Sequence, residues 1–207
     1  MPIETYCAFL VASIVILIIP GPTIMLVVSC SLAQGKRAAL PLALGVGLGD
    51  MVALIASMVG LGALLATSAA MFTILKWIGA IYLMYLGIKM WRTRPEVGAS
   101  MANMRAESRR SHVLRAFVVT ATNPKSIAFF CAFLPQFIDH SMPVLPQVCI
   151  LGVTFVTLAV INAALYALLA VRARAAVSSP YAMKMVNRTG GTALIGAGLL
   201  TAALRRA

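Results

Sequence analysis

Asp50 is the acidic residue whose position most clearly indicates chemistry, because it lies near the middle of a long apolar segment, Leu40–Leu65. A carboxylate at membrane depth is costly, so it must be paired or must reach a water-filled cavity. Lys125, in another apolar segment, is the candidate partner. A structural ion pair would be a costly way to hold two helices together. We therefore predict that Asp50 binds and releases a proton, as a proton-coupled carrier requires.

Two motifs interrupt apolar segments that would otherwise form continuous helices, Pro20-Gly21-Pro22 and Asn123-Pro124-Lys125. Proline lacks a backbone N–H group and clashes with the preceding turn, but it suits the first position of a helix. Each motif therefore predicts a half-helix that begins inside the membrane with free N–H groups and a positive dipole end. Two such ends facing each other would form an anion site for a substrate carboxylate. A proline kink without a ligand is the alternative.

Small and polar residues near these motifs have a competing structural explanation. Gly45 and Gly49 have the spacing that lets two helices pack closely, and packing is their expected main role. Asn162 could line a cavity or make a hydrogen bond between helices, and the two readings are equally favoured. The predicted substrate-binding residues are Pro20, Gly21, Pro22, Asp50, Asn123, Pro124, Lys125 and Asn162.

The elements that position these residues are membrane helices. The chain has 207 residues, of which 61% are hydrophobic and 11% charged, and its mean hydropathy is +0.97. Soluble proteins have about 45–50% apolar and about 25% charged residues, so a soluble domain and a disordered chain are both excluded. The net charge of +12 does not indicate a nucleic-acid-binding protein, because the basic residues lie between apolar segments and not on one wettable face.

Six apolar segments have about the length of a membrane-spanning helix. They are Thr5–Val28, Leu40–Leu65, Phe72–Met90, Val113–Phe137, Val144–Val171 and Met183–Leu204. The sixth is the weakest, because it opens with Lys184 and Arg188, and five spans remain possible if it lies in the interface. The sequence therefore predicts an all-α integral membrane protein with a single transmembrane domain over residues 1–207.

The two halves of the chain resemble each other weakly. Residues 1–91 and 113–207 each contain three apolar segments, and the polar, basic segment 92–112 separates them. Leu40-Pro41 opens the second segment and Leu145-Pro146 opens the fifth. Three spans in each half would place the second copy upside down. We therefore predict two inverted three-helix repeats with broken first and fourth helices, an arrangement found in secondary transporters; a chance match is the alternative.

Basic residues alternate between successive predicted loops. The first, third and fifth loops contain lysine or arginine, whereas the second and fourth contain neither. Short loops rich in lysine and arginine lie in the cytoplasm. The 92–112 loop is therefore predicted to be cytoplasmic and the N-terminus external. With six spans the C-terminus would also be external, although Arg205 and Arg206 disagree with that placement.

The sequence contains no recognisable catalytic, metal or cofactor site. His112 and His140 fall in predicted loops on opposite sides, and the four cysteines lack the spacing of metal ligands. No glycine-rich loop precedes a lysine and a serine or threonine as in ATP-binding proteins. We therefore expect neither an enzyme nor a primary pump, and no catalytic residue, metal or cofactor. A secondary carrier would need only an ion gradient.

The ordered set of motifs resembles the LysE/RhtB family of bacterial amino-acid exporters over nearly the whole chain. The matching motifs are Pro20-Gly21-Pro22, Gln34-Gly35-Lys36-Arg37, Gly45 to Asp50, Tyr82-Leu83-Met84-Tyr85-Leu86-Gly87, Asn123-Pro124-Lys125, Phe133-Leu134-Pro135-Gln136-Phe137, Asn187-Arg188, Gly190-Gly191 and Gly196-Ala197-Gly198. Each motif is weak alone, whereas the set in this order is specific.

The resemblance implies export of amino acids or close derivatives from the cytoplasm, driven by the proton gradient. It implies a multi-pass protein of the bacterial inner membrane with an amino acid and protons as its small-molecule partners and the lipid bilayer around it, and it is compatible with a homodimer. It does not identify the amino acid. The alternatives are a structural or regulatory membrane subunit, and an exporter of another small solute or of a cation.

Overall fold

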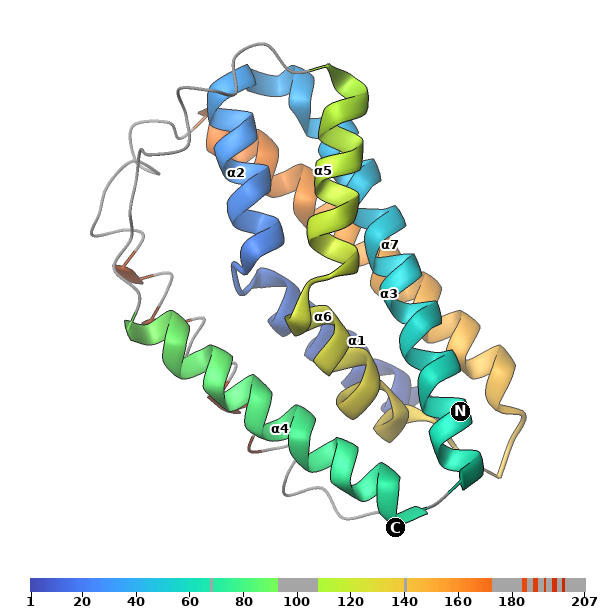
Figure 1. Ribbon diagram of the computed structural model, residues 1–207. Helices are drawn as coiled ribbons and strands as arrows, with labels where there is room; N and C mark the ends of the chain where they lie inside the picture. The colour runs from blue at the N-terminus through green and yellow to red at the C-terminus, as the bar shows by residue number, and fades with distance from the viewer. Residues whose placement is uncertain are drawn as a thin grey trace.

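The computed structural model describes residues 1–67, 69–92, 108–139 and 141–172, together with residues 184, 185, 188, 189, 192, 195, 196 and 199. Every regular element among these residues is helical (Figure 1), as the composition predicted. Most of the predicted sixth segment and most of the 92–112 segment lie outside the described residues. The number of spans and their repeat relation therefore remain predictions.

The helices follow the predicted segments closely. The elements are α1 (Ile3–Ile18), α2 (Pro22–Gln34), the 3-10 helix η1 (Gly35–Ala38), α3 (Ala39–Thr67), α4 (Ala69–Arg92), α5 (Arg109–Ala121), α6 (Pro124–Ala128), the π-helical η2 (Phe129–Phe133), the 3-10 helix η3 (Leu134–Phe137) and α7 (Val144–Arg172). The first and fourth predicted segments are both broken where the proline motifs predicted a break, so this expectation is confirmed.

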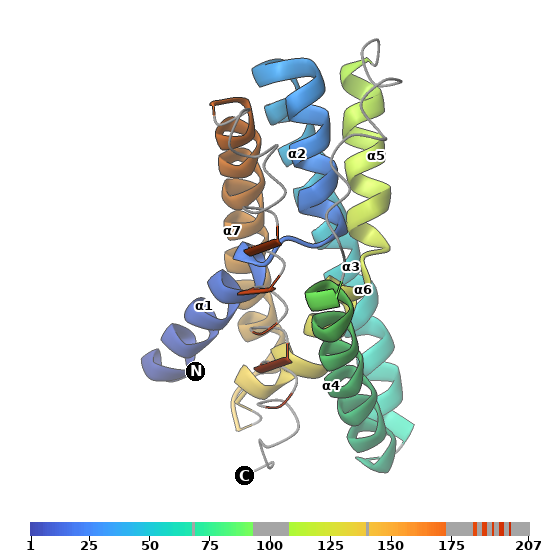
Figure 2. The ribbon, with the colours of Figure 1, turned by 90° about the vertical axis from the view of Figure 1, so that its left-hand side faces the viewer.

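The long helices α3 and α7 organise the bundle. Helix α3 packs mainly against α5 and α7, and both α1 and α2 pack along α7. Helices α2 and α5 lie together at one end of the bundle, and α1 and α6 continue from the two breaks toward the other end (Figures 1 and 2). Figure 2 shows that α1 slants away from the axis of α7. The two breaks therefore lie at intermediate depth along the bundle.

A buried aromatic cluster lies below the breaks and joins α1, η2 and α7. The rings of Phe129 and Phe155 stack with centroids 5.0 Å apart, and Phe130 meets Phe155 edge to face at 4.9 Å. Phe9 of α1 approaches Phe129 at 6.2 Å. Each ring removes a large apolar area from its surroundings, and such pairs add about 0.5–1.5 kcal/mol beyond burial. This cluster anchors the elements that flank the candidate site.

Helix α7 presents apolar residues both to the bundle and to its surroundings. Its buried positions recur every fourth residue, in the order Leu151, Phe155, Ala159, Ala163 and Ala167. Its outer face is mostly apolar and includes Val153 and Leu165, which are 68% and 52% exposed. A helix at the surface of a soluble protein would place polar residues there. Such a surface suits hydrocarbon and not water.

Two helical stretches of the described chain are long and apolar enough to cross a bilayer, Pro22–Gly60 and Val144–Arg172. The bent pair Arg109–Ala121 and Pro124–Phe137, whose axes differ by 42°, makes a third if it forms a single broken span. Helix α1 is apolar but shorter. The chain therefore has the helices of a membrane protein.

Close packing of α3 depends on its glycines, as their spacing predicted. A Cβ atom on Gly49 would lie 2.7 Å from the backbone oxygen of Phe117 and 2.7 Å from Cβ of Thr120, both on α5. A Cβ atom on Gly45 would overlap the backbone oxygen of Val113, also on α5. Only glycine allows this approach, so the predicted packing role is confirmed. Asp50 is the next residue of α3 after Gly49.

Several basic segments gather at one end of the bundle. The 3-10 helix η1, the start of α5 and the end of α7 lie together there (Figures 1 and 2). These segments carry Lys36, Arg37, Arg109, Arg110 and Arg172. The arrangement agrees with the predicted alternation of basic loops, in which this end would face the cytoplasm.

The prediction for His112 was wrong. Helix α5 begins at Arg109, with Ser108 as its N-cap, so His112 lies in its first turn and not in a loop. The ring is 2% exposed, and its Nε2 atom lies 2.6 Å from Oε1 of Gln34 at the end of α2. The polar composition of the preceding segment concealed the start of the helix. The contact joins α2 to α5 at the basic end of the bundle.

Candidate functional site

The first break separates α1 from α2. Ile19 and Gly21 have extended backbone conformations, and Pro22 takes the first helical position of α2. No side chain of the described residues caps the α2 N-terminus, and the backbone N–H of Met25 is the first to reach back, to the Gly21 oxygen at 2.9 Å. Since proline has no N–H group, the N–H groups of Thr23 and Ile24 have no acceptor within the helix. The helix therefore begins with two donors and a positive dipole end.

The second break separates α5 from α6. Asn123 is the N-cap of α6, and the backbone N–H of Lys125 donates to its Oδ1 atom at 3.1 Å. Pro124 takes the first helical position. The capping role predicted for Asn123 is thus confirmed. The helix continues into the π-helical η2, a form that is often found near functional sites.

Side chains join the two breaks to each other. The Asn123 amide donates to the Thr23 hydroxyl at 3.1 Å, and the Thr120 hydroxyl donates to the same oxygen at 3.3 Å. Lys125 lies against Gly21, where an added Cβ atom would be 3.4 Å from Nζ. Thr23 and both of its hydrogen-bond partners are buried. The sequence therefore brings its two helix-breaking motifs into one buried polar cluster.

Replacing Asn123 with alanine should destabilise this junction. The change removes the α6 cap and the bond to Thr23, and a lost N-cap costs about 1–2 kcal/mol. We expect the thermal unfolding midpoint of the purified protein to fall by roughly 2–8 °C. Thr122→Ala is the matched control, because Thr122 is adjacent but exposed. Equal midpoints for the two variants would contradict the role given to Asn123.

The last carbonyl groups of α1 are bound by side chains from the second half of the chain. Lys125 Nζ donates to the Ile16 oxygen at 3.1 Å and to the Ile19 oxygen at 2.7 Å. From α7, Asn162 donates to the Leu17 oxygen at 2.9 Å and Tyr166 donates to the Ile18 oxygen at 2.7 Å. Carbonyl groups at a helix end lack partners within the helix. Four consecutive ones, at residues 16–19, are satisfied here.

Asp50 lies beside the second break and is 3% exposed. The Ser126 side chain hydrogen-bonds its carboxyl group, and Lys125 is close enough for the two charges to attract each other. Its Oδ1 atom has no hydrogen-bond partner among the residues that the structure describes. A buried carboxylate oxygen without a donor is costly. The arrangement leaves an acceptor ready for a proton or for a cationic group.

The predicted site residues divide into three groups. Pro20, Gly21, Pro22, Asn123 and Pro124 form the two breaks. Asp50 and Lys125 are buried and interact, as predicted, although the hydrogen bonds of the Lys125 ammonium group go to α1. Asn162 makes the hydrogen bond between helices that was its alternative reading. Whether any of these residues binds a substrate stays a prediction.

Sequence reasoning missed four polar residues of the cluster, Thr23, Thr120, Ser126 and Tyr166. Thr23 and Ser126 directly follow the residues Pro22 and Lys125 of the two motifs, so their proximity to the breaks was available from the sequence. Tyr166 lies four residues after Asn162 and hence on the same face of α7. Thr120 gave no such signal, because its position depends on how α5 packs against Gly49.

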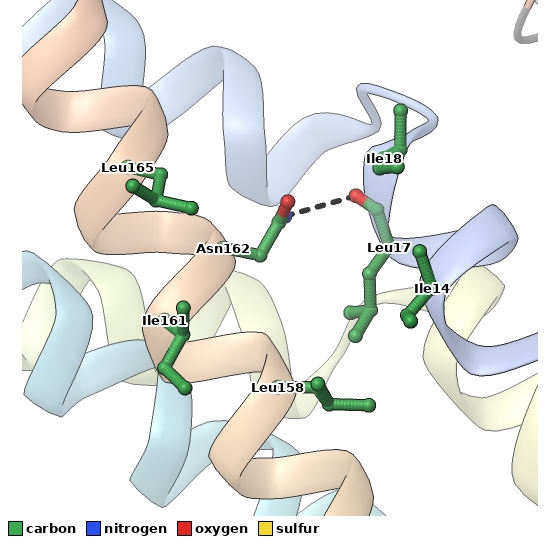
Figure 3. A pocket seen from close by; sticks show the side chains of 7 residues that line it. All are labelled: Ile14, Leu17, Ile18, Leu158, Ile161, Asn162 and Leu165. Carbon is green, nitrogen blue, oxygen red and sulfur yellow. Dashed lines mark hydrogen bonds between the residues drawn. The ribbon is translucent and has the colours of Figure 1, made fainter. Parts of the chain in front are cut away.

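A cavity of about 180 Å3 lies between α1 and α7 (Figure 3). It is lined by Ile14, Leu17, Ile18, Leu158, Ile161, Asn162 and Leu165. Its polar side chain is the Asn162 amide, which is bound to α1 (Figure 3). Aliphatic walls do not suit charged groups. We therefore place the candidate site at the polar cluster around Asp50.

A bundle of apolar helices with two breaks and buried charged residues is the architecture of a membrane transport protein. The chain matches the LysE type translocator family over residues 14–204, and it belongs to this family. A family of this class handles small-molecule substrates. The resemblance based on the motifs is thereby confirmed.

Two related proteins match all or nearly all of the chain, and a third matches about two thirds of it. A protein of Vibrio cholerae serotype O1 named uncharacterized membrane protein is 36% identical over 202 residues, 98% of each chain. The homoserine/homoserine lactone efflux protein of Salmonella typhimurium is 37% identical over 209 residues, 100% of each chain. The leucine efflux protein of Klebsiella pneumoniae is 32% identical over 134 residues, 65% of this chain and 63% of its own. No solved structure matches the chain.

Proposed function

We propose that the chain is a secondary active exporter that moves amino acids or close derivatives out of the cytoplasm in exchange for protons. The family and the efflux proteins among its relatives support amino-acid export. The observation that carries the proton step is Asp50, which is 3% exposed and has a carboxylate oxygen without a partner among the described residues. A buried carboxyl group of this kind can alternate between a proton and a cationic ligand.

The two charged groups of an amino acid find complementary partners in the cluster. Its ammonium group binds Asp50. Its carboxylate binds the N–H groups that follow Pro22, with the Lys125 ammonium within reach. The first N–H group after Pro124, predicted to be free, is instead bound by the Asn123 side chain. A proton from outside then competes for Asp50 and drives release of the substrate. Substrate and proton therefore share one carboxyl group, which couples their opposite movements.

We further propose the membrane arrangement that this mechanism needs. Six spans form two inverted three-helix repeats in the bacterial inner membrane, and the broken helices are the first of each repeat. The basic end of the bundle faces the cytoplasm. In this arrangement the two helix breaks face the membrane centre from opposite repeats, so small movements of one repeat would expose the cluster to either side.

A transport assay over a panel of amino acids tests the function. Vesicles containing the purified protein are given a proton gradient, and movement of each labelled amino acid, including homoserine and leucine, is followed. We expect gradient-dependent movement of at least one amino acid, well above vesicles without protein. If no amino acid moves, although the protein is folded, the proposal is wrong and a structural or regulatory subunit becomes the better explanation.

A further inference from the structure

The carbonyl groups at the end of α1 are arranged like a cation-binding site that is already occupied. Four consecutive carbonyl groups, at residues 16–19, accept hydrogen bonds from Lys125, Asn162 and Tyr166. The negative end of a helix dipole favours a cation, and the only cation among these donors is the Lys125 ammonium. In transporters with broken helices, such half-helix ends bind cations. Here the ammonium group of Lys125, a side chain of the protein itself, takes the place of such a bound cation at the end of α1.

The site offers an ammonium group two carbonyl acceptors and the attraction of a nearby carboxyl group. An ammonium group has three donors, and Lys125 uses two of them on the Ile16 and Ile19 oxygens. The carboxyl group of Asp50, whose charge attracts Lys125, has a free Oδ1 atom among the described residues. Two carbonyl oxygens and a nearby buried carboxyl group therefore suit a cation that carries N–H donors. A trimethylated nitrogen has the same charge but could donate to none of them.

We propose that the end of α1 and Asp50 together form a binding site for a free primary ammonium group. Lys125 is the built-in ligand in this conformation. The inference rests on the proposed function in one respect: during transport the substrate's carboxylate draws Lys125 away, and the substrate's own ammonium group takes its place. Exchange of the two ammonium groups loosens α1 from α6, which links binding to movement of the first half-helix.

The site defines a substrate class. A transported molecule needs an unmodified primary ammonium group, because each methyl or acyl group removes a donor and adds bulk. Trimethylated or N-acylated forms of a transported amino acid should therefore not compete for transport, whereas changes in the side chain should be tolerated better. Competition by the trimethylated form as strong as by the parent amino acid would contradict this requirement.

The closing experiment measures binding to this site by its effect on thermal stability, without a transport step. Lys125→Ala removes three carbon atoms and the nitrogen, which propylammonium replaces. The variant leaves two buried carbonyl groups without donors, so its thermal midpoint in detergent should fall on the order of 10 °C below the wild type. Saturating propylammonium should recover at least half of the loss. Tetramethylammonium, which carries the charge but no N–H group, should recover none.

A control variant separates binding of propylammonium at this site from general effects of the two ions on protein stability. Lys36→Ala removes an exposed lysine from η1 and should respond to neither ion. If Lys125→Ala is not recovered in folded form, purification in propylammonium should recover it. Failure of propylammonium to stabilise the variant or to recover it, or equal stabilisation by tetramethylammonium, would overturn the proposal. Because no substrate moves in this assay, its outcome is independent of whether the chain exports amino acids.

Discussion

Asp50→Asn should abolish export driven by a proton gradient while the protein stays folded. The substitution preserves the shape of the side chain but removes the negative charge that attracts an ammonium group and the site that a proton occupies. Removing the charged partner of a bound, hydrogen-bonded ammonium group costs about 2–5 kcal/mol of binding free energy, which corresponds to a loss in rate of at least about 30-fold. Uptake of a labelled substrate into reconstituted vesicles, with and without a proton gradient, measures the loss.

The control for this variant is Glu4→Gln, which removes an acid from the exposed first turn of α1. It should transport at the wild-type rate. The thermal midpoint of Asp50→Asn should lie within a few degrees of the wild type, so that a transport defect cannot be attributed to unfolding. Gradient-driven export at the wild-type rate in Asp50→Asn would remove this residue from the mechanism.

Gly49→Val should destabilise the protein more than any exposed substitution on the same helix. The first added carbon would already lie 2.7 Å from the Phe117 backbone oxygen and from Cβ of Thr120. Because backbone cannot move aside cheaply, we expect overpacking to cost at least about 3 kcal/mol. The thermal midpoint should fall by roughly 6 °C or more, and much of the protein should fail to accumulate in the membrane.

Gly60→Val is the matched control on α3. Gly60 is exposed, and a Cβ atom there would meet no atom within 4 Å. Both variants introduce the same branched side chain into the same helix, so their intrinsic helix preferences cancel. A thermal midpoint for Gly60→Val as low as that for Gly49→Val would show that close packing of α3 on α5 is not what makes Gly49 sensitive.

Local chemistry explains which features could be predicted from the sequence. The breaks at Pro22 and Pro124 depend on a missing N–H group and a ring clash, both of which are properties of the residue itself. The packing of Gly45 and Gly49 depends on a four-residue spacing along one helix. Burial of Asp50 follows from the apolar segment around it. Each of these expectations needed no knowledge of a distant element.

Features that depend on distant elements were not available from the sequence. Lys125 was expected beside Asp50, but its ammonium group reaches the carbonyl oxygens of Ile16 and Ile19, more than a hundred residues earlier. His112 was placed in a loop because the residues before it are polar, although it is buried against Gln34. Which acceptor a long side chain selects is decided by tertiary packing and not by its neighbours in sequence.

The most direct test of the central claim follows protons in vesicles that contain a pH-sensitive dye and no imposed pH gradient. A gradient of a transported amino acid should drive protons in the opposite direction through the wild-type protein. The same gradient should move no protons through Asp50→Asn, even if slow exchange of the amino acid persists. Proton movement through Asp50→Asn at the wild-type rate would contradict the claim that substrate and proton share this carboxyl group.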